Sequence, residues 1–309
     1  MEAASPNRDA VKTAITQTMA FFSLYELPLN LHTIHQLLYK QRGSFADVSI
    51  AVGELVASGK LVAHDGLYAL KAWDDGRVLA NKKEIQKRWR KVDKYFWALS
   101  IIPFIDHVSI INSLAFGNAH QESDIDFFVV TKPHRLYTVR SLIIVIFRLL
   151  GVYKTRQHIN ERFCFGFYVT SNKPELEPVL IPGEDPLFAF WFASFAPLIN
   201  IAGYRHLVVA NPWVYGYFPN FDLEARLSYI KEKNRFLRLL KGLLEILLTI
   251  PAILFEPFLR SIHIRHTFNL PENSWATSTT IANQDMLKLH ALDPRIDVRG
   301  RFRTILREL

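Results

Sequence analysis

Apolar residues recur at helical spacing over the first quarter of the chain. Three segments show this pattern and predict three helices: residues 11–24, 29–39 and 44–58. Asn30 stands where the second of these helices would begin, and asparagine is a favoured N-cap. Two short apolar runs then flank Asp65-Gly66, and this dipeptide favours a tight hairpin because both residues accept a positive φ. The pattern predicts a small module of three helices and a hairpin.

In the middle of the chain, short apolar runs predict strands. They cover residues 108–111, 126–130 and 163–169. Between the last two runs, residues 136–150 are apolar almost all round and end before Gly151, which is typical of a helix that covers a sheet. We expect the three strands to be neighbours in one sheet, with this helix packed on one face. Strict alternation along the third run would place Cys164, Gly166 and Tyr168 together on one face.

The last part of the chain is predicted to be helical. Asp185-Pro186 is a typical helix start, and it leads into an aromatic run over 187–198 that we expect to pack in the core. Two further stretches have helical spacing, residues 227–259 and a basic amphipathic tail at 296–309. The prolines of the first stretch, Pro251 and Pro257, are expected to break it, because proline lacks the N–H that a helix interior needs.

Residues 237–259 are apolar enough to raise the question of a membrane. Charges at Lys241, Glu245 and Glu256 and two prolines interrupt the stretch, so we expect no membrane span. A helix packed on the core is the first interpretation, and a basic amphipathic helix lying on a membrane surface is the alternative.

These elements divide the chain into four parts. They are a three-helix module (1–72), a basic connecting helix (73–104), a core of strands and helices (105–180) and a helical C-terminal region (181–309). We therefore expect an α/β (α+β) fold whose core contains a small mixed sheet. With 309 residues, half of them hydrophobic, the chain is long enough to bury a substantial core in two or three domains.

The first module resembles a winged helix domain, with the segment 44–58 in the position of the recognition helix. That segment carries Asp47 and Glu54 and no arginine, which disfavours direct contact with DNA bases. Winged helices also bind proteins, and the two alternatives stay open.

The net charge of +8 favours contact with a polyanion. Much of that charge lies in residues 82–91, a predicted helix with six cations and one tryptophan. This basic helix predicts salt-sensitive contact with nucleic acid, and a solvated face of a connecting helix is the alternative.

The chain has one cysteine, Cys164, so it forms no intrachain disulfide. Because Cys164 lies in an apolar run, we expect a buried, unreactive thiol. The first nine residues are polar and show no apolar stretch of the kind found in a signal peptide. We expect a cytoplasmic protein.

The most specific chemical pattern lies between the first two predicted strands. A small-residue turn begins at Asn112-Ser113, and Asp124-Ile125-Asp126 opens the second strand. Because side chains alternate along a strand, Asp124 and Asp126 project from the same face. Two carboxylates this close repel each other unless a hard divalent cation such as Mg²⁺ or Mn²⁺ lies between them. The pair predicts a metal site for phosphoryl or nucleotidyl transfer.

This stretch resembles the signature of the DNA polymerase beta-type nucleotidyltransferase superfamily. In that signature a strand leads into Gly-Ser and a short helix with a second glycine, and an aspartate pair opens the next strand. Ser113 matches the serine, Gly117 the second glycine, and Asp124 and Asp126 the metal ligands. Asn112 replaces the first glycine, and asparagine is the commonest substitute for glycine in left-handed backbone. The resemblance covers about residues 105–170.

The resemblance implies Mg²⁺-dependent transfer of a nucleoside monophosphate from a nucleoside triphosphate to an acceptor hydroxyl. Asp124 and Asp126 would be the catalytic and metal-binding pair. The residues expected to bind the nucleotide are Asn112, Ser113, Gly117, Ser123 and Arg140. A solvated basic face is the alternative for Arg140.

The superfamily usually supplies a third carboxylate from a later strand, and here the strand at 162–169 contains no acid. Glu161, just before it, is the remaining candidate. A catalytically degenerate fold that acts as a nucleotide-, DNA- or protein-binding regulator is therefore the alternative function.

Overall fold

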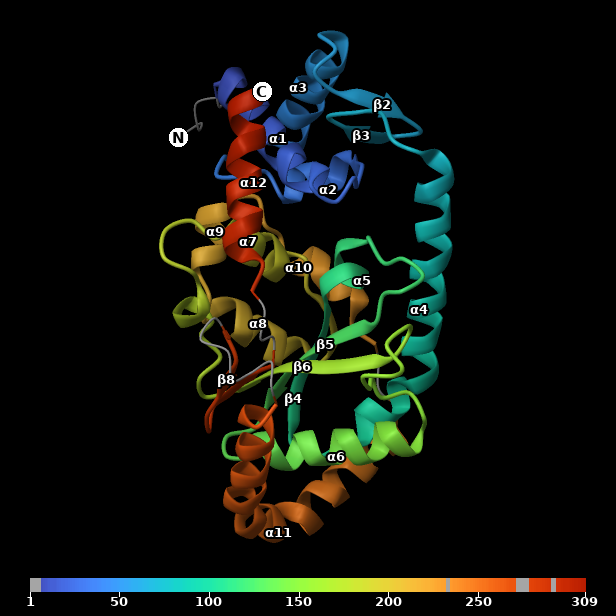
Figure 1. Cartoon of the computed structure of the whole chain (residues 1–309), viewed down its shortest axis with the longest axis vertical. Coiled ribbons are helices and arrows are strands. Elements are labelled where there is room, and N and C mark those ends of the chain that lie inside the picture. Colours follow the sequence, from blue (N-terminus) through green and yellow to red (C-terminus); the bar gives the residue numbers. More distant parts are fainter. Residues whose placement is uncertain (1–6, 232–233, 271–277, 290–292) are drawn as a thin grey trace.

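A computed structural model describes residues 7–231, 234–270, 278–289 and 293–309 and shows a mixed α+β molecule (Figure 1). At its centre is a six-stranded sheet in the order β7-β4-β5-β6-β9-β8. The strands are β4 (Ile105–Ile111), β5 (Ile125–Thr131), β6 (Phe163–Thr170), β7 (Ala196–Ile199), β8 (Ile281–Ala282) and β9 (Met286–Lys288).

The three strands expected from the apolar runs are neighbours in this sheet, as predicted. β4 pairs with β5 antiparallel, and β5 pairs with β6 in parallel through the crossover helix α6 (Leu136–Leu149). One face of the sheet packs on α6 and on α4 (Asp75–Ile101), the long helix that runs along one side of the molecule in Figure 1. Between β4 and β5 lies the short helix α5 (Asn112–Phe116).

The expected faces of β6 are wrong beyond Gly166. Phe127 pairs with Phe165, whereas Phe128 pairs with Phe167, so Gly166 is an extra residue without a partner on β5. Such a bulge shifts the alternation of side chains by one residue. As a result Phe167 lies on the face opposite α6, and Tyr168 packs on the α6 side together with the other phenylalanines.

The three helices and the hairpin of the first module are present. They are α1 (Arg8–Ser23), α2 (Leu31–Gln36), α3 (Phe45–Ala57), β2 (Val62–His64) and β3 (Leu67–Ala69), and β1 (Leu29–Asn30) pairs with β3. Asn30 caps α2 by accepting a hydrogen bond from the Thr33 N–H, as expected. Asp65 and Gly66 both have positive φ, 48° and 73°, which the predicted hairpin turn requires.

The region after residue 180 is less purely helical than expected, because it also supplies β7, β8 and β9. Its first helices are α7 (Pro186–Ala193), α8 (Ile201–Val209), α9 (Trp213–Tyr217) and α10 (Leu223–Arg226), followed by a short 3-10 turn at Leu227–Tyr229. Another 3-10 turn, Glu177–Val179, precedes this region, and α12 (Arg295–Glu308) is its last helix. Asp185 caps α7 as predicted. The aromatic run divides between α7 and the edge strand β7.

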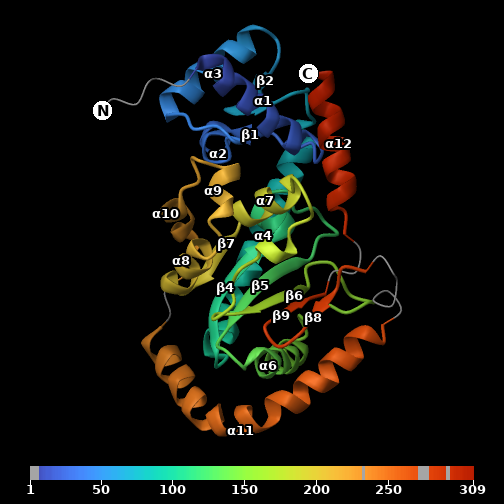
Figure 2. The same cartoon turned by 90° about the vertical axis from the view of Figure 1, so that its left-hand side faces the viewer.

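The helix expected to break at two prolines is continuous. α11 runs from Arg235 to Phe268 through Pro251 and Pro257, and Figure 2 shows it as an arc around the end of the molecule that carries α6. The hydrogen bonds that the prolines cannot donate are lost without ending the helix, and proline is a common cause of helix bending. By length and composition alone, α11 is apolar enough to cross a membrane.

The first module and the C-terminal helices share one core. Phe21 of α1 stacks on Phe190 of α7, with ring centroids 3.9 Å apart, and Phe302 of α12 contacts Phe21 edge-on. The same cluster continues to the face of the sheet that carries Phe128 and Phe167. The module is therefore packed against the rest of the chain at this face of the sheet.

Candidate functional site

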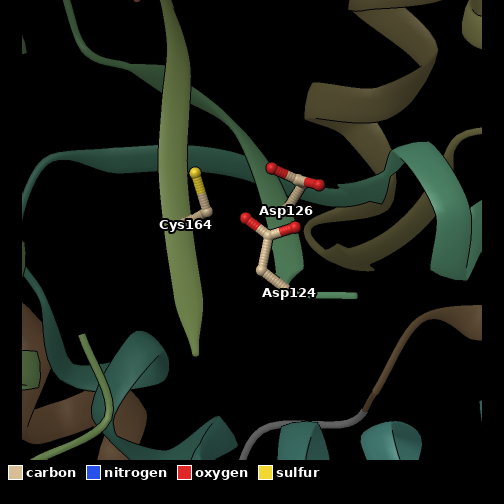
Figure 3. A group of neighbouring side chains, drawn as sticks. All are labelled: Asp124, Asp126 and Cys164. Carbon is tan, nitrogen blue, oxygen red and sulfur yellow. The ribbon is translucent and has the colours of Figure 1, made fainter. Parts of the chain in front are cut away.

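The predicted aspartate pair lies where β5 begins. Asp124 precedes the strand and Asp126 is in its second position, and both side chains point to the same side (Figure 3). Cys164 of β6 is paired in register with Asp126, and its thiol points toward the pair. The carboxylate oxygens and the sulfur lie within 4.8 Å of one another, close enough to share one metal ion.

Asp126 carries an unfavourable buried charge. Its side chain is buried, and burial together with the neighbouring charge of Asp124 raises the pKa of Asp126 from 3.8 to about 7. Hydrogen bonds from the side chains of Asn112 and Cys164 favour the ionised form but only partly offset this effect. A divalent cation would relieve the repulsion between the two carboxylates.

Asn112 has the backbone conformation that its place in the motif predicts. Its φ is 56°, in the left-handed region where glycine and asparagine are favoured. Its side-chain oxygen accepts a hydrogen bond of 2.7 Å from the indole N–H of Trp191. Gly117 ends α5 in the left-handed conformation with φ of 77°. Ser113, in the first turn of α5, is partly exposed beside Asn112.

Lys154 is a site residue that the sequence analysis missed. Its ammonium donates to Asp124 Oδ2 at 2.6 Å, from the loop between α6 and β6. Burial favours the neutral amine, but the surrounding acidic groups raise the pKa of Lys154 above its usual range. The lysine neutralises part of the charge of the pair. The sequence pattern did not indicate this lysine, because it reaches the site only through the crossover connection from β5 to β6.

The third side chain beside Asp124 and Asp126 is Cys164 and not Glu161. Glu161 has a positive φ of 57° and forms an ion pair of 2.5 Å with Lys87 on α4. Burial and the charge of Asp126 raise the pKa of the Cys164 thiol well above its usual value, so it is a neutral thiol beside the carboxylates. The thiol lies on the strand where the resemblance anticipates a third carboxylate.

Arg88 holds the loop that leads into Asp124. It is fully buried, and its guanidinium donates to the carbonyl oxygens of His120, Gln121 and Ser123 at 2.6–3.1 Å. The Ser123 hydroxyl accepts from the His120 N–H within the same turn. Ser123, expected to bind the nucleotide, is thus engaged in shaping the loop. Arg88 belongs to the basic helix that was predicted to contact nucleic acid, but it is buried and therefore cannot contact a polyanion.

Arg140 is not brought to the aspartate pair. Its guanidinium donates to His263 of α11 at 3.2 Å and lies 5.9 Å from the ring centroid of Tyr168. Both contacts are on the α6 side of the sheet, whereas Asp126 projects from the other face. Burial and the charge of Arg140 lower the pKa of His263 to about 4, so the imidazole is neutral.

A cavity of about 340 Å³ adjoins the site. Asn112 and Ser113 form part of its wall, next to aromatic side chains from four segments of the chain: Phe22, Tyr25, Phe116, Phe167, Phe188 and Trp191. Its polar rim includes Lys288 and Arg295, which are both paired with Asp293. Its size and its mostly apolar wall are those of a small-molecule pocket.

Comparison of the chain with protein-family models, with curated proteins and with solved structures finds no match.

Proposed function

We propose that the chain is a nucleotidyltransferase-like protein that binds a nucleoside triphosphate together with Mg²⁺ or Mn²⁺ at Asp124 and Asp126. The observation that carries the proposal is the clustering of these two carboxylates with Cys164 within 4.8 Å, with Asp126 buried. A carboxylate that is buried beside a second carboxylate is costly, and such groups are common at functional sites.

The donor set fits a divalent cation that takes its remaining ligands from the substrate. Two carboxylates are typical protein ligands of Mg²⁺, which usually keeps water or phosphate oxygens in its other positions. The neutral thiol of Cys164 is a poor ligand for a hard cation. When bound, the cation would neutralise charge on the triphosphate. Asp124 and Asp126 would hold it, with binding of the ion alone weak.

In the proposed reaction the oxygen of an acceptor hydroxyl forms a bond to the α-phosphorus. The bond from the α-phosphorus to the bridging oxygen of the β-phosphate breaks, pyrophosphate leaves with that electron pair, and the hydroxyl proton passes to water. Lys154 is close enough to the pair to contact the negatively charged phosphates once a cation replaces it on Asp124. Ser113 is assigned to the phosphates from the motif resemblance.

The aromatic wall of the cavity suits a planar or apolar part of the substrate. Trp191 links the cavity to the site, because it forms part of the wall and donates to Asn112, which in turn contacts Asp126. Aromatic walls favour stacking of a nucleobase. A bound base would change the fluorescence of Trp191, and Trp191→Phe would remove that change.

A catalytically degenerate protein is the second candidate, and two observations favour it. Cys164 stands where a third carboxylate is anticipated, and Lys154 already pairs with Asp124. A site with two carboxylates and one lysine retains ligands for a cation and phosphates but offers little to activate an acceptor hydroxyl. Nucleotide binding would then persist without transfer, in a nucleotide-, DNA- or protein-binding regulator.

Incubation with labelled nucleoside triphosphates and Mg²⁺ or Mn²⁺ distinguishes the two candidates. An enzyme releases pyrophosphate and transfers label to itself or to an added acceptor, and Asp126→Asn abolishes both. Asp297→Asn, an exposed change on α12, is the matched control and should leave them unchanged. Nucleotide binding without release of pyrophosphate favours the degenerate protein. Absence of both nucleotide binding and turnover would refute the enzyme and would restrict the degenerate protein to a regulator that binds DNA or protein.

A further inference from the structure

The long helix α11 is amphipathic in the reverse of the usual sense, with its apolar side toward solvent. Twelve large apolar side chains along it are exposed, for example Leu239 and Ile246 at 75% and Ile250 at 69%. The exposed set is Phe236, Leu239, Leu243, Ile246, Leu247, Ile250, Ile253, Leu254, Phe255, Phe258, Ile262 and Phe268. Most recur every three or four residues, so they form one continuous stripe. An exposed apolar surface of this extent marks an interaction site.

The polar side of α11 faces the protein. Glu256 accepts hydrogen bonds from the backbone N–H groups of Tyr137 and Thr138, both at 2.8 Å, in the first turn of α6. Glu245 accepts from the N–H of Phe104 at 2.9 Å and from Lys132 at 2.7 Å. Both acids of the helix are therefore held by the core, and they fix which side of α11 is exposed.

The exposed charges of α11 are all positive. Arg235 and Arg238 lie at one end of the apolar stripe and Arg265 at the other, and no acid of this helix faces solvent. Apolar residues flanked by arginines complement a lipid surface with anionic headgroups. In Figure 2 the arc of α11 forms the outer boundary of the molecule, at the end opposite the first module, so a flat surface can approach it.

We propose that α11 lies in the interfacial layer of an anionic phospholipid bilayer and holds the chain on the membrane surface. Its apolar stripe would enter the boundary of the acyl chains, while Arg235, Arg238 and Arg265 contact the headgroups. The helix does not span the bilayer in this arrangement, because a span would break the contacts of Glu245 and Glu256 with the core and bury both carboxylates in lipid. The proposal is independent of the nucleotide site.

Flotation with vesicles tests the proposal. The full chain is mixed with preformed vesicles of phosphatidylcholine, with or without phosphatidylglycerol, and centrifuged in a density gradient. The protein should float with the anionic vesicles and much less with the neutral ones. Ile246→Glu/Ile250→Glu should reduce the bound fraction at least about tenfold, because the change removes two apolar contacts and adds repulsion.

A charge-matched control separates this effect from net charge. Ile50→Glu/Leu79→Glu adds the same two negative charges at exposed apolar positions on α3 and α4 and should float like the wild type. Failure of the wild type to float, or equal flotation of the α11 variant, would overturn the proposal. Retention in the vesicles after alkaline carbonate extraction would overturn the surface position in favour of a span. A dimer in sedimentation analysis that the α11 variant dissociates, without flotation of the wild type, would assign the stripe to a second copy of the chain.

Discussion

Asp126 of β5 and Cys164 of β6 are partners in register across two parallel strands, with the thiol directed toward the carboxylate (Figure 3). The relationship places a soft, neutral donor beside two hard, acidic ones at the start of β5. It is relevant to both proposed candidates, the nucleotidyltransferase and the degenerate protein. The aspartates would supply ligands for a cation, whereas the thiol weakens the site for Mg²⁺.

Replacing Asp126 with asparagine should stabilise the metal-free protein above pH 7. The pKa of Asp126 is about 7 in the folded chain against 3.8 as its ordinary value, so the folded state binds more protons between these values. The free energy of unfolding therefore falls as pH rises from about 4 to about 7 and stays at the lower level above pH 7, whereas below about pH 4 the effect vanishes. Above pH 7, Asp126→Asn should gain on the order of 2–4 kcal/mol.

Urea unfolding with a chelator present, well below and well above pH 7, measures this gain. Saturating Mn²⁺ should reverse the order of stabilities, since the ion binds the wild type more tightly than the variant. An equal free energy of unfolding for both proteins at high pH would show that the Asp126 charge is already compensated.

Cys164→Asp should strengthen binding of divalent cations. A third carboxylate at this position adds a hard oxygen ligand, so the dissociation constant for Mn²⁺ should fall at least about tenfold, or about 1.4 kcal/mol. Titration followed by the rise in melting temperature measures the affinity. Cys164→Ser is the size-matched control and should leave it nearly unchanged. Unaltered Mn²⁺ affinity in Cys164→Asp would mean that position 164 does not face the ion.

Arg88→Gln should destabilise the chain far more than Arg90→Gln, although the two arginines are neighbours in one basic helix. Arg88 is buried and holds three loop carbonyls, whereas Arg90 is exposed. Loss of the buried guanidinium should cost on the order of 3 kcal/mol in the free energy of unfolding. Chemical denaturation compares the two variants. Similar, small losses for both would contradict the role assigned to Arg88.

The exposed cations of α4 should give weak, salt-dependent binding of nucleic acid. Lys82, Lys83 and Arg90 face solvent, while Lys87 is paired with Glu161. Replacing Lys82, Lys83 and Arg90 with glutamine should lower the affinity for duplex DNA of any sequence and flatten its salt dependence. Fluorescence anisotropy at several salt concentrations measures both. Full affinity in the triple variant would leave these side chains as a solvated face.

The sequence predicted helix caps and turns correctly where the residues that form them are close together in the chain. Asn30, the Asp65-Gly66 turn and the Asp185 cap act within a few residues, and each does so in the structure. The strands around the aspartate pair also agree, because their apolar runs are short and clearly bounded.

The features that the sequence did not predict depend on contacts between residues that are far apart in the chain. The bulge at Gly166 depends on the pairing of β6 with β5, and Lys154 reaches Asp124 only through the crossover connection. α11 continues through two prolines although each removes a backbone hydrogen bond, and Glu256, next to Pro257, is bonded to the first turn of α6. The sequence does not show that the apolar side of α11 faces solvent, because this depends on the contacts of Glu245 and Glu256 with the core.

Calorimetric titration of a nucleoside triphosphate tests the central claim most directly. The wild type should bind the nucleotide at least about tenfold more tightly with Mn²⁺ than with a chelator. Asp124→Asn/Asp126→Asn should lose that difference, and Asp297→Asn should retain it. Equal nucleotide affinity for the wild type and the double variant in the presence of Mn²⁺ would contradict a cation-dependent nucleotide site at the aspartate pair.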